Sequence, residues 1–215
     1  MVVVSTGDLH FVVKVPASTA NLGPGFDTLG LAVDLNLTVT LEVTSSASNG
    51  EPIVSVECKG RDSKSIPADR SNYIVSLVEK YATGKGMTAF KQGHRYKFSI
   101  DNEIPIGKGL GSSGAATVAG ITIGMVICGE RIEKMDIYRN SLLFEKHPDN
   151  ISASVFGGLN VCPPNGLKPI QIPWPSALIT FVVVPGFELK TETSRSALPS
   201  SYTIADTVFA NTFYN

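Results

Sequence analysis

Residues 105–116 read PIGKGLGSSGAA, where four glycines and two serines stand directly before an apolar run. A segment with so few side chains lets backbone N–H groups approach a ligand closely, and the free amides of a following helix attract anions. Residues 112–128 are small, apolar and free of proline, so they predict a buried helix that starts at this loop. The stretch predicts a phosphate-binding loop, and a glycine-rich turn that allows close helix packing is the alternative.

Two better-known phosphate loops fit this segment poorly. Residues 109–114 match G-x-G-x-x-G, but a dinucleotide fold needs a strand immediately before the motif and an acid at the end of the next strand. Here Pro105 and other residues separate the loop from the strand-like 96–100, and Glu130 lies in a second helical stretch. A Walker A loop fails as well, because Gly109 follows Lys108 where a serine or threonine is required.

A second polar turn lies upstream, in PASTANLGPGFDTLG (16–30). Asn21 and Asp27 are six residues apart and are separated by a Gly-Pro-Gly turn, which can direct both side chains into one cavity. The alternative is a connection to the next strand that is capped by these side chains.

A third polar segment is FEKHPDNISASVFGG (144–158). Pro148 predicts the end of a helix over 131–146, with Glu145 in its last turn. A carboxylate there opposes the helix dipole, so a compensating cation is expected. The loop after the helix would hold three polar residues, His147, Asp149 and Asn150. For His147 a hydrogen bond to the backbone is the alternative role.

Strand and helix patterns occur together without a regular alternation, which predicts an α+β fold. Strict alternation over 35–43 predicts a half-buried antiparallel strand, and 53–59 is predicted to be its partner. Helical spacing indicates a helix over 71–83. Further strands are expected in 11–15, which stops at Pro16, and in 179–184. The proline-rich 163–175 marks a boundary between a domain of residues 1–165 and a second one that begins at 166.

Composition excludes several classes of protein. The chain has 215 residues, 43% hydrophobic and 17% charged, so it is globular, and its net charge of −1 gives no general attraction to nucleic acid or membranes. The basic cluster around Arg95 is interpreted as a solvated strand edge, with phosphate or RNA contact as the alternative. Three widely spaced cysteines predict neither disulfides nor a zinc site. Without a signal peptide or a membrane-length apolar run, a cytoplasmic location is expected.

Together the segments VKVPASTANLGPGFDTLG, IPIGKGLGSSGAA and EKHPDNISASVFGG resemble the GHMP small-molecule kinases, in order and spacing across about 13–195. Among these kinases the similarity is greatest to those that act on L-homoserine. The resemblance implies ATP- and Mg2+-dependent phosphorylation of the L-homoserine hydroxyl, in threonine biosynthesis. It implies an N-terminal ATP-binding domain like domain 2 of ribosomal protein S5, followed by an α+β C-terminal domain. A homodimer is left open.

The resemblance also assigns roles to residues. The ATP phosphates would be held by a loop comprising Pro105, Gly107, Lys108, Gly109, Leu110, Gly111, Ser112, Ser113, Gly114 and Ala115. Asn72 would lie near the adenine, and Ser113 and Glu145 would bind Mg2+. Homoserine would contact six residues, Asn21, Asp27, His147, Asn150, Thr191 and Arg195. The residues expected beside the reacting groups are Lys108, Ser113 and Asn150.

Asn150 stands where related kinases such as mevalonate kinase place an aspartate. An amide cannot accept the hydroxyl proton, so we hypothesise that no dedicated protein base takes part. Relatives of this kind are longer than 215 residues and carry a third glycine-rich motif, so the sequence is predicted to be truncated, with 166–215 an incomplete second domain. Two rivals are an inactive, truncated nucleotide or amino-acid binder of the same fold, and a nucleic-acid module, which the net charge disfavours.

Overall fold

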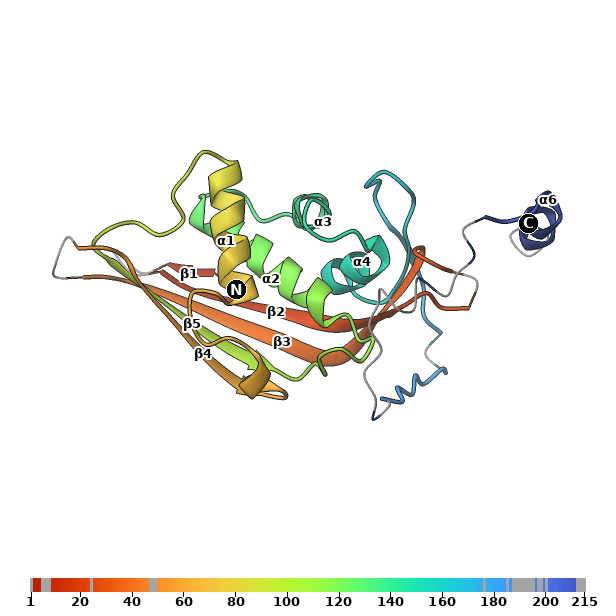
Figure 1. The fold of residues 1–215 in the computed structure, drawn as a ribbon, viewed down its shortest axis with the longest axis horizontal. Coiled ribbons are helices and arrows are strands. Elements are labelled where there is room, and N and C mark those ends of the chain that lie inside the picture. Colours follow the sequence, from red (N-terminus) through yellow and green to blue (C-terminus); the bar gives the residue numbers. More distant parts are fainter. Residues whose placement is uncertain are drawn as a thin grey trace.

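A computed structural model describes residues 2–4, 9–23, 25–46, 50–175, 177–184, 186, 196, 199 and 201–211. Its centre is a seven-stranded mixed sheet in the order β1-β2-β3-β5-β4, and β6 and β7 extend from the other end of β3. The strands are β1 (Val2–Val4), β2 (Leu9–Ala20), β3 (Leu29–Ser45), β4 (Ile53–Gly60), β5 (His94–Asn102), β6 (Leu159–Val161) and β7 (Ile170–Ile172). Figure 1 shows the helices of residues 73–156 packed on one face of this twisted sheet.

The helices follow the strands in a mixed order, as expected for an α+β fold. They are the short 3-10 turn η1 (Ser63–Ser65), α1 (Tyr73–Gly84), α2 (Ser112–Ile127), α3 (Lys134–Ser141), α4 (Pro148–Phe156) and α6 (Ile204–Asn211). The predicted helices over 71–83 and 112–128 are thus confirmed, whereas the one over 131–146 shrinks to α3. In the described chain, no helix is both long and apolar enough to cross a lipid bilayer.

Helix α2 forms the centre of the core. Its small, apolar sequence makes nearly every position suitable for burial, so it packs on the sheet, on α1 and on α4 at once. Gly120 and Gly124 lie against Leu77 and Tyr81 of α1, where an added Cβ would meet those side chains at 3.0 Å or less. The small residues therefore bring the two helices close together and fix where α2 begins.

The alternation over 35–43 corresponds to β3, whose Leu37, Val39 and Leu41 are buried. The predicted pairing of 53–59 with this strand was wrong. Strand β4 runs parallel to β5, and β5 lies between β4 and β3. Helix α1 connects β4 to β5, and a helical crossover of this length permits parallel pairing, which a hairpin does not.

The predicted end of the first strand at Pro16 was also wrong. Strand β2 continues to Ala20, and its register against β3 shifts between Pro16 and Ala17. A bulge tolerates proline because the ladder hydrogen bond is interrupted there anyway. The additional strand residues 17–20 lead the chain directly to the polar turn at Asn21.

Residues 179–184 do not form the predicted strand. Ile179, Phe181 and Val183 are between 78% and 89% exposed, and the described residues provide no strand beside them. An apolar β-branched run forms a strand only when a neighbour satisfies its backbone groups. In Figure 1, α6 lies apart from the layers of the main fold. The three cysteines, Cys58, Cys128 and Cys162, are free thiols.

Candidate active site

A cavity of about 960 Å³ opens where the N-terminus of α2 meets the loop before it. The loop backbone takes positive φ angles at Gly107 (68°), Gly109 (71°) and Gly111 (66°), a conformation that residues with a Cβ rarely adopt. Gly111 is the N-cap of α2 and offers no side chain to the first amides of the helix. The N–H groups at the start of α2 therefore stay available for an anion.

Hydrogen bonds from outside hold the loop in place. The main-chain N–H of Ser18 on β2 donates to the carbonyl of Leu110 at 3.1 Å, and the N–H of Ile106 donates to a carboxylate oxygen of Asp62 at 3.0 Å. The buried amide of Asn102 donates to the carbonyl of Ile104 at 2.9 Å. Residues at or near the ends of β2, β4 and β5 thus fix one side of the loop, and its other side faces the cavity.

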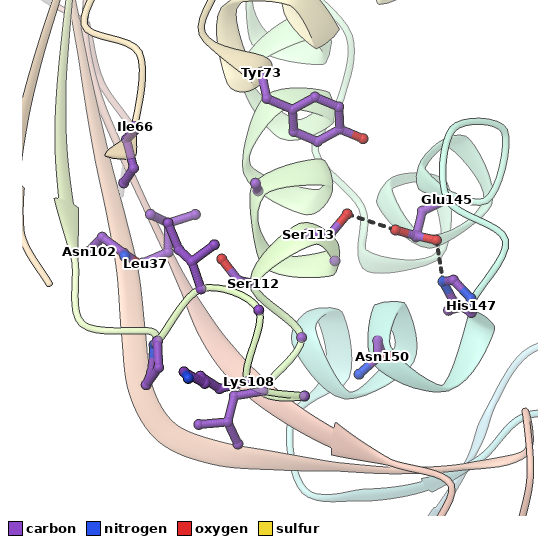
Figure 2. A pocket seen from close by; sticks show the side chains of 18 of the residues that line it. Leu37, Ile66, Tyr73, Asn102, Lys108, Ser112, Ser113, Glu145, His147 and Asn150 are labelled. Atoms are coloured by element: carbon purple, nitrogen blue, oxygen red, sulfur yellow. Dashed lines mark hydrogen bonds and ion pairs between the residues drawn. The ribbon is translucent and has the colours of Figure 1, made fainter. Parts of the chain in front are cut away.

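One wall of the cavity carries a hydrogen-bonded chain of three side chains, seen in Figure 2. The Ser113 hydroxyl donates to Oε2 of Glu145 at 2.9 Å, and the other carboxylate oxygen of Glu145 pairs with Nδ1 of His147. The prediction that Glu145 lies in the last turn of a helix was wrong, because α3 already ends at Ser141. It lies in the connection that leads to α4.

Pro148 starts a helix where the sequence predicted an end. It occupies the first position of α4, where its missing N–H costs no hydrogen bond. Asp149 and Asn150 therefore belong to the first turn of α4, and His147 is its N-cap. The Asn150 amide donates to the Ser18 hydroxyl at 3.0 Å. Both polar helix starts, of α2 and α4, thus meet at the cavity.

Asp149 is fully buried behind this wall. Its Oδ1 accepts the main-chain N–H of Asn150 at 2.8 Å, whereas Oδ2 has no partner among the described residues. Burial raises the pKa of this carboxyl above its ordinary value, and the negative charge of Asp27 adds to the increase. Asp149 thus supports the backbone of the first turn of α4.

The turn at 21–27 adopts left-handed backbone angles at both polar residues, with φ of 59° at Asn21 and 54° at Asp27. Asn21 lines the cavity, and its Oδ1 accepts the main-chain N–H of Asp27 at 2.9 Å. The structure therefore shows the capping interaction and the cavity position of Asn21 together, which the sequence analysis treated as alternatives.

The far end of the cavity is more apolar and is lined by Ile66, Pro67 and Tyr73. Asn72 caps α1 there: its Oδ1 accepts the N–H of Ile74 at 2.9 Å, and its amide donates to the Pro67 carbonyl at 2.8 Å. Since these bonds engage both ends of its carboxamide, Asn72 shapes this end of the cavity.

The fold and the site correspond to a known family. Residues 72–158 match the GHMP kinases N terminal domain. The homoserine kinase of Synechocystis sp. is 33% identical over 205 residues, and that of Aliarcobacter butzleri is 37% identical over 199 residues. The chain therefore contains a GHMP kinase N-terminal domain. The matches cover 94% and 92% of this chain, which spans 64% of the length of each relative.

A solved structure agrees with this assignment. The crystal structure of homoserine kinase from Cytophaga hutchinsonii superposes on this chain with a TM-score of 0.70 at 25% identity. The match covers 94% of this chain and 64% of the solved one. The predicted fold class, α+β with a GHMP kinase N-terminal domain, is therefore confirmed.

Most of the residues that the sequence analysis singled out line this one cavity. They are Asn21, Asn72, Pro105, Gly107, Lys108, Gly109, Leu110, Gly111, Ser112, Ser113, Gly114, Glu145, His147 and Asn150. Ala115 is instead fully buried in the core. Asp27 lies next to Asn21 rather than on the cavity wall. Thr191 and Arg195 lie outside the described residues.

Sequence reasoning missed Ser18 and the apolar residues at the far end of the cavity. Ser18 belongs to the quoted segment PASTANLG, but its inward direction depends on the bulge at Pro16. Tyr73 follows Asn72 directly, and its hydroxyl lies 3.2 Å from that of Thr117 on α2. An aromatic residue beside a helix cap gives no sequence signal of a cavity.

The residues that line the cavity fit a nucleoside triphosphate and a divalent cation. Bare amides at the start of α2, together with Lys108, suit phosphate oxygens. The hydroxyl of Ser113 and the carboxylate of Glu145 are hard oxygen donors of the kind that Mg2+ prefers. The part of the chain that is described contains no cluster of three or more His, Cys, Asp or Glu residues that could hold a metal ion.

Proposed function

We propose that the chain transfers the γ-phosphoryl group of ATP to the hydroxyl of L-homoserine, which gives O-phospho-L-homoserine. The similarity to homoserine kinases over more than nine-tenths of the chain supports this substrate. The observation that carries the proposal is the arrangement of the cavity, where the glycine loop, the Ser113–Glu145 pair and Asn150 surround one space.

On the nucleotide side, the backbone amides of Gly107 to Gly114 would bind the phosphates, and Lys108 would neutralise part of their charge. Its Nζ lies 3.2 Å from the carbonyl of Gly186, a neutral partner that a phosphate can replace. The apolar end beside Asn72 and Tyr73 suits a nucleobase. Phosphoryl transfer requires mainly such positioning and neutralisation of charge.

Mg2+ would neutralise charge on the phosphates when bound, and Ser113 and Glu145 are the side chains that we assign to it. Glu145 is held by two partners, so its carboxylate is oriented before any cation arrives. A fixed carboxylate loses less side-chain entropy on binding than a mobile one.

On the substrate side, Asn21, Asp27, His147 and Asn150 would hold homoserine. Asp27 suits the ammonium group of the amino acid, and Asn150 suits its hydroxyl. Thr191 and Arg195 are also assigned to homoserine, since a guanidinium can form two parallel hydrogen bonds with a carboxylate.

The proton of the attacking hydroxyl would leave to phosphate or solvent, without a dedicated protein base. Asn150 lines the cavity at the position where related kinases place an aspartate, and an amide cannot accept the proton. Replacing Asn150 by aspartate is expected to raise turnover and to add an acidic limb to the pH–rate profile. A profile of the unmodified enzyme that requires a deprotonated side chain at the reacting hydroxyl would contradict this mechanism.

The test of the function uses the chain with labelled ATP, Mg2+ and L-homoserine. Labelled phosphohomoserine supports the proposal, and binding of MgATP by calorimetry without product supports the rival, an inactive binder. Salt-sensitive RNA binding without MgATP affinity would favour a nucleic-acid module.

We also propose a cytoplasmic location, a boundary between domains near residue 165 and assembly as a homodimer. Limited proteolysis would cut near 163–175 if residues 1–165 form a separate domain. Light scattering of the same preparation would detect a homodimer.

A further inference from the structure

Ser18 links three parts of the active site, although it does not line the cavity itself. It lies on β2 and is fully buried. Its main-chain N–H donates to the carbonyl of Leu110 in the glycine loop at 3.1 Å. Its hydroxyl accepts a hydrogen bond from Nδ2 of Asn150, on α4, at 3.0 Å. A single small residue thus connects the strand, the loop on the nucleotide side and the helix on the substrate side.

Gly111 leaves room for this pair of side chains. A Cβ at Gly111 would overlap the Ser18 hydroxyl oxygen and lie 3.1 Å from Nδ2 of Asn150. The glycine therefore serves two needs, its positive φ of 66° and the close approach of the Ser18 hydroxyl. The position of the loop and the position of the Ser18–Asn150 hydrogen bond depend on each other.

In the structure, the Asn150 carboxamide directs its nitrogen to the Ser18 hydroxyl, which acts as the acceptor. An asparagine side chain donates through nitrogen and accepts through oxygen. Because the nitrogen of Asn150 is engaged by Ser18, its carbonyl oxygen is left to accept a hydrogen bond in the cavity that Asn150 lines. A flipped amide would present only N–H donors there, and it could not accept a hydrogen bond from the hydroxyl that attacks phosphorus.

We propose that Ser18 is a positioning residue, which holds the Asn150 carboxamide with its oxygen toward the hydroxyl of the amino-acid substrate. This inference rests on the proposed function for the identity of the substrate. Ser18 acts through Asn150, so its hydroxyl matters only while the asparagine is present.

The kinetic test is a double-mutant cycle of Ser18→Ala and Asn150→Ala in the full chain. Ser18→Ala keeps the main-chain bond to Leu110 and removes only the hydroxyl, so the affinity for MgATP is expected to stay within about twofold. The kcat is expected to fall about five- to tenfold, as for the loss of one neutral hydrogen bond, with a smaller change in the KM for homoserine. In the Asn150→Ala background, Ser18→Ala should have no further effect. Equal losses of kcat in both backgrounds would overturn the proposal.

Ser154→Ala is the matched control. The Ser154 hydroxyl, also buried, donates to the carbonyl of Pro16 at 3.2 Å, and so joins the same helix and strand away from the cavity. If Ser18 only attaches α4 to β2, both serine variants should lower kcat equally. We expect only Ser18→Ala to lower it, with similar thermal midpoints for the two variants.

A second measurement requires neither activity nor a stable variant. In the unmodified chain, the side-chain amide protons of Asn150 should exchange with water at least about tenfold more slowly than those of exposed Asn21, because Ser18 engages them. Equal exchange rates would overturn the positioning role. If the chain showed this protection but no turnover of homoserine, the proposed function would fail and the Ser18–Asn150 hydrogen bond would stand.

Discussion

Gly111→Ala, compared with Gly109→Ala, separates backbone strain from steric overlap in the phosphate loop. Both glycines have nearly the same left-handed φ, 66° and 71°. At Gly109 an added Cβ meets nothing within 4 Å, whereas at Gly111 it overlaps the Ser18 hydroxyl. Gly109→Ala should therefore cost about 1 kcal/mol of unfolding free energy, from strain alone. Gly111→Ala adds overpacking and a weakened hydrogen bond, so it should cost about 2–4 kcal/mol.

Urea denaturation followed by far-ultraviolet circular dichroism measures the two costs. With an m-value of about 2 kcal/mol per M, the midpoint should fall by about 0.5 M for Gly109→Ala and by about 1–2 M for Gly111→Ala. The double variant Gly111→Ala with Ser18→Gly removes the overlapping hydroxyl and should recover part of the difference. Equal midpoints for the two single variants would refute the close packing of Gly111 on Ser18.

Four further substitutions test neighbouring features. Gly30→Ala places a Cβ onto the main-chain carbonyl of Asp149, so it should lower the free energy of unfolding by about 2–3 kcal/mol; an unchanged urea midpoint would contradict the contact. Asp149→Asn tests the raised pKa: ionising this buried carboxyl costs the folded state stability as pH rises above the ordinary value of 3.8, so the variant should gain thermal stability over the unmodified chain at pH 7 more than at pH 4. An equal difference at both pH values would show that the carboxyl is not desolvated. Glu145→Gln should lower Mg2+-dependent turnover at least about tenfold, and Ser113→Ala should lower it less, while homoserine affinity by calorimetry changes less than turnover does; a larger loss of homoserine affinity would reassign Glu145.

Local patterns were sufficient for much of the fold and the site. The small, apolar and proline-free run 112–128 predicted α2, and alternation over 35–43 predicted the buried face of β3. Most of the predicted nucleotide-side residues line one cavity, because the loop and the helix start are continuous in sequence. A contiguous motif needs no knowledge of the rest of the fold.

The errors arose where one signal serves two structures. Proline ends helices and also begins them, and Pro148 begins α4; the apolar Ile151 and Val155, four residues apart, were the available sign of a helix after it. The partner of 53–59 could not be read locally, because α1 separates β4 from β5 in sequence. Ser18 went unnoticed since its importance comes from Asn150, which lies 132 residues away.

Strand β3 pairs along its length with β2, at one end with β5 and at the other with β6. Its backbone therefore joins β5, which leads into the glycine loop, to β6, which follows α4. Neither part of the sheet can separate from the rest without breaking hydrogen bonds of β3. Native-state hydrogen exchange should therefore find the central amides of β3 among the slowest, exchanging together in a single global opening.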